Sequence, residues 1–300
     1  MKAPKPLWRI SVTTTSEAED AVSEMLALVF GLAAAAYFDL KSRTSCVSVF
    51  LEAGKFSAGA ARAEIATGLE RIKDFGLDIG AAKTEIARVR REDWAESWKR
   101  HFHPLQIGKR LLVKPSWSQQ RAAQNQAVVV LDPGLSFGTG QHPTTAFCLR
   151  EIARCLKPGV AQSFLDMGTG SGILAIAAAK LGYRPVRAFD FDPESVRVAK
   201  ENARKNCVAR RVTLTRGDVT KLALKPARQF DLVCANLASN LLIAQRERIV
   251  NRLKSDGTLV LAGILAAEFA EVERAFAGLN LKLTASRKEK EWRSGAFCFG

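Results

Sequence analysis

The sequence has few of the residues that build metal centres or covalent cross-links. Its six cysteines form no Cys-x-x-Cys pair, and it holds only three histidines. A structural zinc site uses four such ligands at short spacings, and a disulfide framework is typical of small secreted chains. We therefore expect no metal site and no disulfide framework, with the cysteines packing as small apolar side chains in a reducing compartment.

Long apolar runs are also missing. The longest uncharged apolar run near the start covers residues 25–38, which is 14 residues flanked by Glu24 and Asp39. A membrane-spanning helix needs about 20 apolar residues. No signal-peptide pattern is visible, and the sequence has no internal repeat or low-complexity tract. The pattern favours a buried helix that runs into a strand, in a cytoplasmic protein without membrane contact.

Acidic residues are scarce in the second part of the chain. Residues 1–90 hold 12 Lys and Arg against 11 Asp and Glu, whereas residues 91–300 hold 33 against 19. Nearly all of the net charge of +15 therefore lies after residue 90. Such a field attracts nucleic acid or acidic partners. A solvated surface accounts for the charge equally well, because no Arg-rich run or aromatic–basic repeat accompanies it.

What the sequence does contain is a regular alternation of strand and helix patterns. The first 90 residues follow the order β-α-β-β-α-β, which is that of a ferredoxin-like domain. Ser16 is expected to cap the first helix and Gly31 to end it. The polar, aromatic segment 91–106 is expected to be a linker that folds as a short helix around Trp94 and Trp98. The expected strands cover 7–13, 35–39, 46–51 and 84–89, and the second helix covers 58–75.

From Ser163 onward, strand and helix patterns alternate, which predicts a parallel sheet with helices on both faces. Two further strand patterns, 111–117 and 127–132, precede this region, and the last pair resembles a terminal hairpin. We assign residues 107–300 to a second domain. Its remaining expected strands cover 163–166, 186–190, 212–216, 232–235, 258–262, 281–286 and 296–299.

The segment Asp166-Met-Gly-Thr-Gly-Ser-Gly172 follows the strand 163–166 and carries the main chemical signal. Its three glycines let the backbone approach a ligand closely, and the helix after them points its amino end at that ligand. The dinucleotide fingerprint is G-x-G-x-x-G. Here the spacing is G-x-G-x-G, because position 173 is Ile. This favours a nucleoside with an amino-acid tail over a pyrophosphate, so a nicotinamide dehydrogenase is disfavoured.

Two carboxylates end the next two expected strands. Asp190 follows Gly172 by 18 residues, and a carboxylate at that strand end can accept hydrogen bonds from ribose hydroxyls. Asp218 ends the following strand, where a carboxylate commonly faces the adenine amino group in such folds. Capping of the next helix explains Asp218 nearly as well.

These residues, together with Phe230-Asp-Leu-Val233, resemble those of class I methyltransferases. Three further segments resemble the ribosomal protein methyltransferase family that modifies large-subunit protein eleven. The most specific is Phe137-Gly-Thr-Gly-Gln-His-Pro-Thr-Thr145, within residues 132–145. The others are 94–99 with 115–117, and Asn236-Leu237 with 262–265. The resemblance covers essentially the whole chain, including the family's ferredoxin-like recognition domain.

The resemblance implies a site for S-adenosylmethionine. Its expected residues are Thr145, Asp166, Gly168, Gly170, Asp190, Asp218 and Asn236. Asn236 is also the expected catalytic residue, because many amine-methylating relatives carry Asn-Pro-Pro-Tyr here and the Asn holds the amine. In this chain the segment is Asn-Leu-Ala-Ser, as in the resembled family, so the aromatic contribution to amine binding is unassigned. The Thr145 hydroxyl either bonds the methionine carboxylate or caps a helix over 146–155.

Other residues near the expected site allow two interpretations each. The loop 137–140 closes over cofactor and amine, or is a plain surface turn. His142 acts as a general base or, as the sequence favours, packs at a helix start. Trp94, Trp98 and Trp117 line a substrate cleft or simply pack.

The sequence thus predicts an α/β protein with a class I methyltransferase Rossmann-like sheet, parallel with a terminal antiparallel hairpin, after a small ferredoxin-like α+β domain. The resemblance implies a monomeric enzyme that methylates lysine side chains or the N-terminal α-amine of large-subunit ribosomal protein eleven. The basic region 91–300 is a candidate contact for ribosomal RNA. Two alternatives remain: an rRNA methyltransferase of the same fold, and a non-catalytic cofactor-sensing or RNA-binding module. The glycine turn, Asp190 and Asn236 argue against the module.

Overall fold

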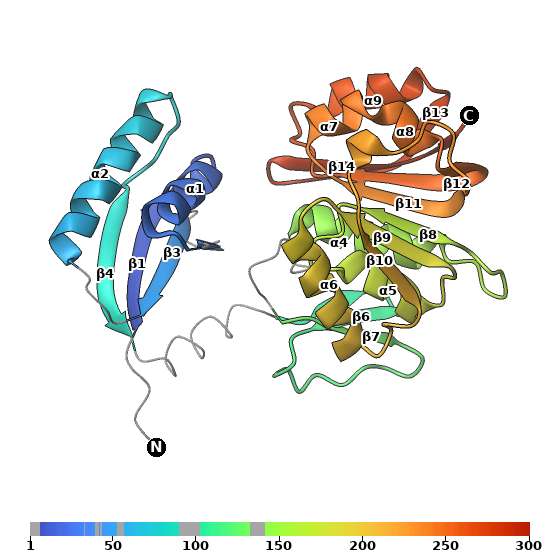
Figure 1. The fold of residues 1–300 in the computed structure, drawn as a ribbon, viewed down its shortest axis with the longest axis horizontal. Coiled ribbons are helices and arrows are strands. Elements are labelled where there is room, and N and C mark those ends of the chain that lie inside the picture. The colour runs from blue at the N-terminus through green and yellow to red at the C-terminus, as the bar shows by residue number, and fades with distance from the viewer. Residues whose placement is uncertain are drawn as a thin grey trace. The chain divides into compact units, whose positions relative to one another are not determined.

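The computed structural model describes residues 7–32, 34–39, 42, 44–52, 57–89, 103–132 and 142–300. The chain divides into two compact units, Met1–His101 and Phe102–Gly300 (Figure 1). No helix in these described ranges is long and apolar enough to cross a membrane. Within the same ranges, no group of three or more His, Cys, Asp or Glu side chains could hold a metal ion.

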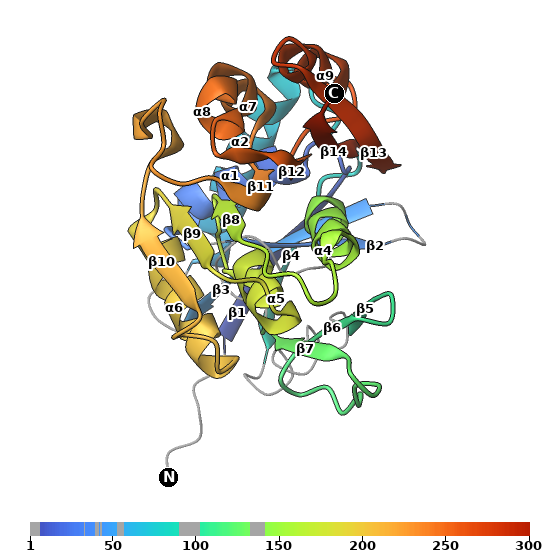
Figure 2. The ribbon, with the colours of Figure 1, turned by 90° about the vertical axis from the view of Figure 1, so that its right-hand side faces the viewer.

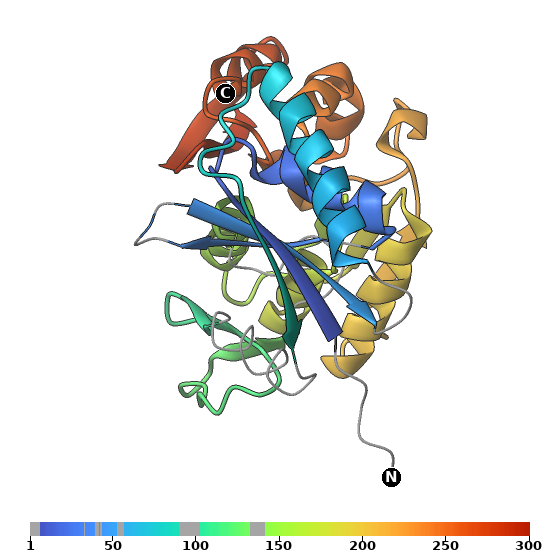
Figure 3. The same cartoon turned by 90° about the vertical axis from the view of Figure 1, so that its left-hand side faces the viewer.

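The first unit is a four-stranded antiparallel sheet with two helices on one face (Figure 3). Its strand order is β2-β3-β1-β4, and its order along the chain confirms the predicted β-α-β-β-α-β pattern. The elements are β1 Leu7–Thr14, α1 Glu19–Phe30, β2 Ala35–Asp39, β3 Thr44–Glu52, α2 Ala58–Asp74 and β4 Lys83–Val89. Alternate residues of the central strands, such as Ile10 and Val49, are fully buried against both helices.

The start of α1 differs from the prediction. Ser16 does not cap this helix: Ala18 stands at the N-cap position without a side-chain hydrogen bond. Instead, the Thr15 hydroxyl accepts a hydrogen bond from the Ala18 N–H at 3.3 Å. Ser and Thr hydroxyls form such local turns as readily as caps, so a run of hydroxyl residues leaves the first helical residue ambiguous. Gly31 ends the helix with φ +64°, as predicted.

The second unit is built on a seven-stranded sheet in the order β10-β9-β8-β11-β12-β14-β13. The first five strands are parallel, and β14 and β13 continue the sheet as an antiparallel hairpin. The strands are β8 Phe164–Met167, β9 Val186–Asp190, β10 Val212–Arg216, β11 Phe230–Asn236, β12 Leu253–Ala262, β13 Leu281–Glu289 and β14 Trp292–Phe299. This is the predicted α/β sheet, with β11, β12, β13 and β14 longer than the sequence indicated.

Helices cover both faces of this sheet, with α4, α5 and α6 on one side and α7, α8 and α9 on the other (Figure 2). They are α4 Pro143–Cys155, α5 Ile173–Leu181, α6 Pro193–Lys205, α7 Ser239–Ala244, α8 Arg246–Val250 and α9 Phe269–Ala277, with a 3-10 turn η1 at Val219–Lys221. Strands covered on both faces read as continuous apolar runs. All four residues of β8 are accordingly buried.

A smaller sheet, in the order β5-β6-β7, completes the second unit. Its strands are β5 Leu105–Ile107, β6 Leu111–Lys114 and β7 Ala127–Val130, so Leu105 and Gln106 belong to a strand rather than to the expected linker. The side chain of Asn206, at the end of α6, links β7 to this helix. Its Oδ1 accepts from the Val130 N–H at 2.8 Å, and its Nδ2 donates to the Val130 carbonyl at 2.7 Å.

Candidate functional site

Three polar side chains lie at the carboxyl ends of neighbouring strands of the large sheet. Asp166 is next to last in β8, Asp190 ends β9 and Asn236 ends β11. The strand β8 lies between β9 and β11, so the sheet grows in both directions from β8. Open α/β sheets bind ligands at such a reversal, beyond the carboxyl ends of the strands. The fold therefore brings these three predicted site residues to one edge.

The turn after β8 requires glycine at two positions, which pack against different neighbours. Gly168 has φ +74°, and a Cβ added there would lie 2.5 Å from Cδ2 of Leu237, the residue after Asn236. Gly172 has φ +81°, and its added Cβ would lie 3.0 Å from Cβ of Ala199 on α6. Residues with a Cβ rarely adopt such φ angles, and neither position has room for one. The turn consequently packs against the end of β11, and α5 begins directly beside α6.

Asp190 holds the glycine turn in place. It is only 7% exposed, and its Oδ2 accepts a hydrogen bond from the Gly170 N–H at 2.8 Å. Its Oδ1 accepts a weaker one from the Asp192 N–H at 3.1 Å. A carboxylate offers about four lone-pair sites, so each oxygen keeps capacity for another donor, such as a ribose hydroxyl. The ribose contact itself stays a prediction.

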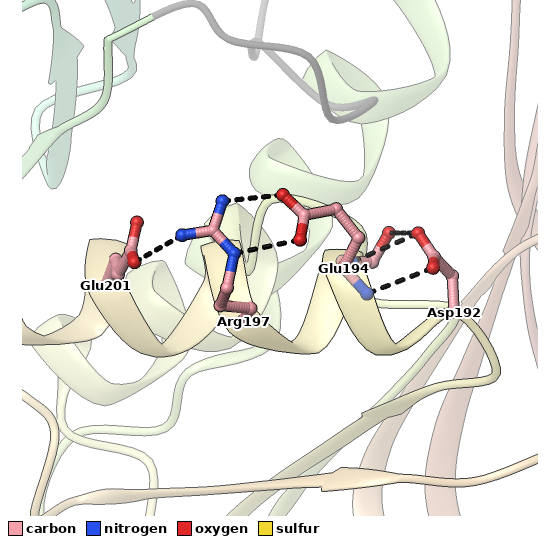
Figure 4. A network of polar contacts seen from close by, with 5 residues as sticks. Asp192, Glu194, Arg197 and Glu201 are labelled. Carbon is pink, nitrogen blue, oxygen red and sulfur yellow. Dashed lines mark hydrogen bonds and ion pairs between the residues drawn. The ribbon is translucent and has the colours of Figure 1, made fainter.

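Asp192 fixes the segment that follows Asp190 by capping α6 (Figure 4). Its carboxylate accepts hydrogen bonds from the N–H groups of Glu194 at 3.0 Å and Ser195 at 3.1 Å. The backbone bond from Glu194 and the Ser195 hydroxyl hold the pKa of Asp192 below its usual value. Further along α6, Arg197 pairs with Glu194 and Glu201, each at 2.5 Å. The loop beside Asp190 is thus anchored at the helix start.

Asp166 is completely buried. Its Oδ2 accepts a hydrogen bond from the Thr169 hydroxyl at 2.6 Å, whereas Oδ1 has no hydrogen-bond partner within the described ranges. Burial raises the pKa of Asp166 to about 7; the Thr169 hydroxyl and the nearby Ala175 N–H lower this pKa, and the Asp190 charge raises it. A buried carboxyl with one unsatisfied oxygen is costly unless another group completes it.

Thr145 Oγ1 and Asn236 Oδ1 are also buried without a hydrogen-bond partner among the residues that the structure describes. In β11, Asn236 is two residues beyond Cys234, which pairs in register with Asp166. Because side chains alternate along a strand, both polar groups face the layer of α4, α5 and α6. Thr145 lies in α4 itself and is 1% exposed. Native proteins rarely leave buried polar atoms unpaired, so these three atoms indicate a site that a ligand completes.

The structure shows which of Thr145 and Asp218 caps a helix, and a ligand role for either residue stays a prediction. The helix α4 begins at Pro143 with His142 at the N-cap position, so Thr145 lies inside the first turn and does not cap the helix. Asp218 does cap: its Oδ1 accepts from the Thr220 N–H at 2.9 Å and the Thr220 hydroxyl at 2.8 Å. These two bonds lower the pKa of Asp218. Both hydrogen bonds are made to Oδ1, so Asp218 Oδ2 takes no part in the cap.

His142 is held as a packing residue, in line with the favoured interpretation. Its Nδ1 lies 2.7 Å from the Thr144 hydroxyl, and its ring meets the Trp292 ring edge to face, with centroids 5.0 Å apart. Trp292 starts β14 and forms an isolated bridge with Leu265, three residues beyond the end of β12. This contact places the start of α4 at the same edge of the sheet as Asn236.

Two residues of this edge were missed by the sequence reasoning. Phe191, directly after Asp190, is 72% exposed; a large apolar residue after a strand-ending carboxylate was the available signal. Gly263 has φ +81°, and a Cβ there would lie 2.7 Å from the Leu237 carbonyl oxygen and 3.0 Å from Asn236 Oδ1. The absence of a Cβ at position 263 therefore leaves room for the Asn236 side chain.

Some predicted residues cannot be placed at this site. The loop 137–140, Trp94 and Trp98 lie outside the described residues. Trp117 is described and is half-buried in the turn after β6.

The described residues fit a nucleoside that carries an amino-acid tail. The unpaired Thr145 hydroxyl and Asn236 amide oxygen can bond polar groups, and Asp190 has spare acceptor capacity beside the glycine turn. The unpaired Asp166 oxygen suits a ligand with cationic or donor groups. The exposed Phe191 ring offers an apolar surface of the kind on which a base can stack.

Comparison with known proteins gives consistent matches along the whole chain. The family model described as ribosomal protein L11 methyltransferase matches residues 6–297. A protein named ribosomal protein L11 methyltransferase from Trichlorobacter lovleyi is 43% identical over 219 residues, covering 72% of this chain and 70% of that protein. One of the same name from Caldanaerobacter subterraneus subsp. tengcongensis is 35% identical over 307 residues, covering 95% and 96%. The crystal structure of ribosomal protein L11 methylase from Lactobacillus delbrueckii subsp. bulgaricus is 30% identical with a TM-score of 0.59, covering 66% of this chain and 99% of that one.

Proposed function

This chain belongs to the ribosomal protein L11 methyltransferase family, and on that premise we propose that it transfers methyl groups from S-adenosylmethionine to amino groups of ribosomal protein L11. The matched range, residues 6–297, includes every residue of the candidate site. One structural observation carries the proposal: Thr145 Oγ1, Asp166 Oδ1 and Asn236 Oδ1 are buried and unpaired in the layer between the sheet and α4.

S-adenosylmethionine supplies a methyl group already activated on a sulfonium, so the protein contributes binding, orientation and exclusion of water. Asp190 would accept the ribose hydroxyls, and the neighbouring Phe191 ring would stack on the adenine. Asp218 Oδ2 stays available to the adenine amino group. Thr145 and Asp166 would hold the polar groups of the methionine tail, because their unpaired atoms lie on the α4 side of the sheet.

The amine that attacks the methyl group must be neutral. With a pKa near 10.4, about one free lysine side chain in a few thousand is neutral at pH 7, whereas an α-amine with a pKa near 8 is neutral far more often. Desolvation beside a sulfonium lowers either pKa. We propose that Asn236 Oδ1 accepts a hydrogen bond from the amine and so directs its lone pair. Trp292, at the start of β14, would supply the aromatic surface that the missing Pro-Pro-Tyr segment leaves unassigned.

We propose that the first unit recognises the protein substrate. Its two helices cover one face of the sheet. On the other face, strand alternation places polar side chains such as Arg9 and Glu85, which pair at 3.6 Å. Deleting residues 1–90 should abolish methylation of L11 but leave cofactor binding in calorimetry intact, because the second unit has its own core. Retained activity on L11 would remove the recognition role.

The decisive assay is methyl transfer from labelled S-adenosylmethionine to purified ribosomal components. Label in L11, at lysine side chains or the N-terminal α-amine by mass spectrometry, is the expected result. Label that enters only ribosomal RNA would sink the proposal, and so would tight cofactor binding without transfer to any component. We also propose that the enzyme acts as a monomer. A ribosomal substrate supports a cytoplasmic location.

A further inference from the structure

A hollow of about 510 Å³ lies beside α4. It is lined by Ile107 at the end of β5, by residues 108–110 between β5 and β6, and by residues of the second half of the helix. Thr145, by contrast, stands in the first turn of α4. We propose that this hollow binds one nucleotide of an RNA, with the phosphate held by Lys109 and Arg150. The proposal rests on the proposed function only in that it takes the RNA to be ribosomal.

The charge of the hollow is strongly positive. Four of its lining residues are cations, namely Lys109, Arg110, Arg150 and Arg154, and one is a carboxylate, Glu151. Glu151 is only 5% exposed, and its Oε2 accepts hydrogen bonds from Arg154 Nε at 2.9 Å and Nη2 at 2.6 Å. The charges of Glu151 and Arg154 therefore neutralise each other. The field in the hollow is therefore that of Lys109, Arg110 and Arg150.

Arg150 is poised for a further acceptor. Its Nη1 is buried and has no hydrogen-bond partner in the part of the chain that the structure describes. The carboxylate near it is Glu289, whose Oε2 lies 4.0 Å from Arg150 Nη1 but 3.0 Å from Arg287 Nε. Glu289 therefore pairs with both arginines and lies closer to Arg287, so its single negative charge does not neutralise both guanidinium groups. A phosphate suits such a planar donor group, because it can accept two parallel hydrogen bonds.

The end of a helix normally repels anions, because its last carbonyl groups point outward. Here side chains donate to several of the carbonyls at the end of α4. Arg110 Nη1 donates to the carbonyls of Ala153 at 2.7 Å and Leu156 at 3.0 Å. Gln162 Nε2 donates to the carbonyl of Cys155 at 3.1 Å. The hollow keeps its positive field although it lies at a helix C-terminus.

The size and lining favour a nucleotide over a bare anion. A volume of about 510 Å³ falls within the range of about 300–1,000 Å³ that organic ligands occupy in proteins. Ile107 and Ala153 add an apolar wall against which a sugar or base can lie. Sequence-independent phosphate contacts are the main source of affinity for nucleic acid. The excess of 33 Lys and Arg over 19 Asp and Glu in residues 91–300 provides the long-range attraction.

The test measures RNA binding by the full chain, with S-adenosylhomocysteine present to fill the cofactor site. The probe is a fluorescein-labelled RNA hairpin with an unpaired loop, followed by anisotropy at several KCl concentrations. The pocket variant combines Lys109→Gln with Arg150→Gln. The control combines Arg197→Gln with Lys200→Gln, which removes the same charge from the exposed face of α6, where Arg197 is already paired with two glutamates (Figure 4).

The pocket variant should bind the hairpin about tenfold more weakly, and its salt dependence should fall by about 0.7 in log–log slope for the lost phosphate. The control should change affinity less than about threefold, because Arg197 and Lys200 lie on α6 and do not line the hollow. Equal losses in the two variants, or none in the pocket variant, would overturn the proposal. So would displacement of the hairpin by AMP or inorganic phosphate at matched concentration, which would identify a free-anion site. A raised KM for L11 with unchanged RNA affinity would identify a protein-docking surface instead. Methyl transfer to L11, assayed separately, reports on the proposed function.

Discussion

Replacing Asp166 by asparagine tests the electrostatics of the site directly. In the folded chain, burial raises the pKa of this carboxyl to about 7, whereas in the unfolded chain it is about 3.9. The folded chain thus keeps a proton that the unfolded chain has lost. This contribution favours folding at low pH and is lost as pH rises from about 4 to about 7. Between pH 5 and pH 8, the wild-type free energy of unfolding should fall by about 2–3 kcal/mol relative to Asp166→Asn.

The assay is urea unfolding of both proteins at several pH values from 5 to 8. The difference between them at each pH isolates residue 166, because all other groups titrate in both. Asp218→Asn is the control: the pKa of that carboxyl is lowered by Thr220, so it is ionised in both states throughout this range and its difference should stay constant. The burial argument is refuted if the difference in free energy of unfolding between wild type and Asp166→Asn is also constant from pH 5 to pH 8.

Three other substitutions test separate parts of the structure. Asp190→Ala should weaken binding of S-adenosylmethionine by about 1–3 kcal/mol, since ribose acceptors and the bond to Gly170 are lost; unchanged affinity in calorimetry would refute the ribose assignment. Asn236→Ala should lower kcat for L11 by about 10- to 100-fold through loss of amine orientation, with a smaller change in cofactor affinity. An effect on cofactor affinity alone would remove its catalytic role. Asn206→Ala should lower the free energy of unfolding by about 2–4 kcal/mol, because the Val130 N–H and carbonyl lose their partner. Denaturant midpoints equal to those of wild type would show that β7 is fastened by other contacts.

Helix starts show where local signals stop being sufficient. The sequence places the first residue of α4 at Ala146, whereas the helix begins at Pro143. Proline is well suited to the first helical position because its N–H would be unpaired there in any case. The two threonines that follow are poor local indicators of a helix. They are buried because α4 packs on the sheet, and this tertiary contact outweighs their weak propensity.

Asp218 and Thr145 show the same limit within the site. Each allowed two roles in the sequence, because a carboxylate or a hydroxyl near a helix start can cap it or bind a ligand. The cap by Asp218 is a local contact to Thr220, two residues away. The unpaired state of Thr145 depends instead on α4 being covered by strands that come much later in the chain. Only coordinates could distinguish these two cases.

Local sequence patterns were enough to predict the strands of the two larger sheets, the glycine turn 168–172, and the carboxylates Asp166 and Asp190 near the ends of β8 and β9. Short sequence segments indicate these features, since strand ends and tight turns depend on a few adjacent residues. The coordinates were needed to identify the polar atoms that remain unpaired and the burial that raises the pKa of Asp166. They were also needed to show that Lys109 and Arg150 line one hollow. Burial and hydrogen-bond capacity depend on segments far apart in the chain, and the fold alone brings those segments together.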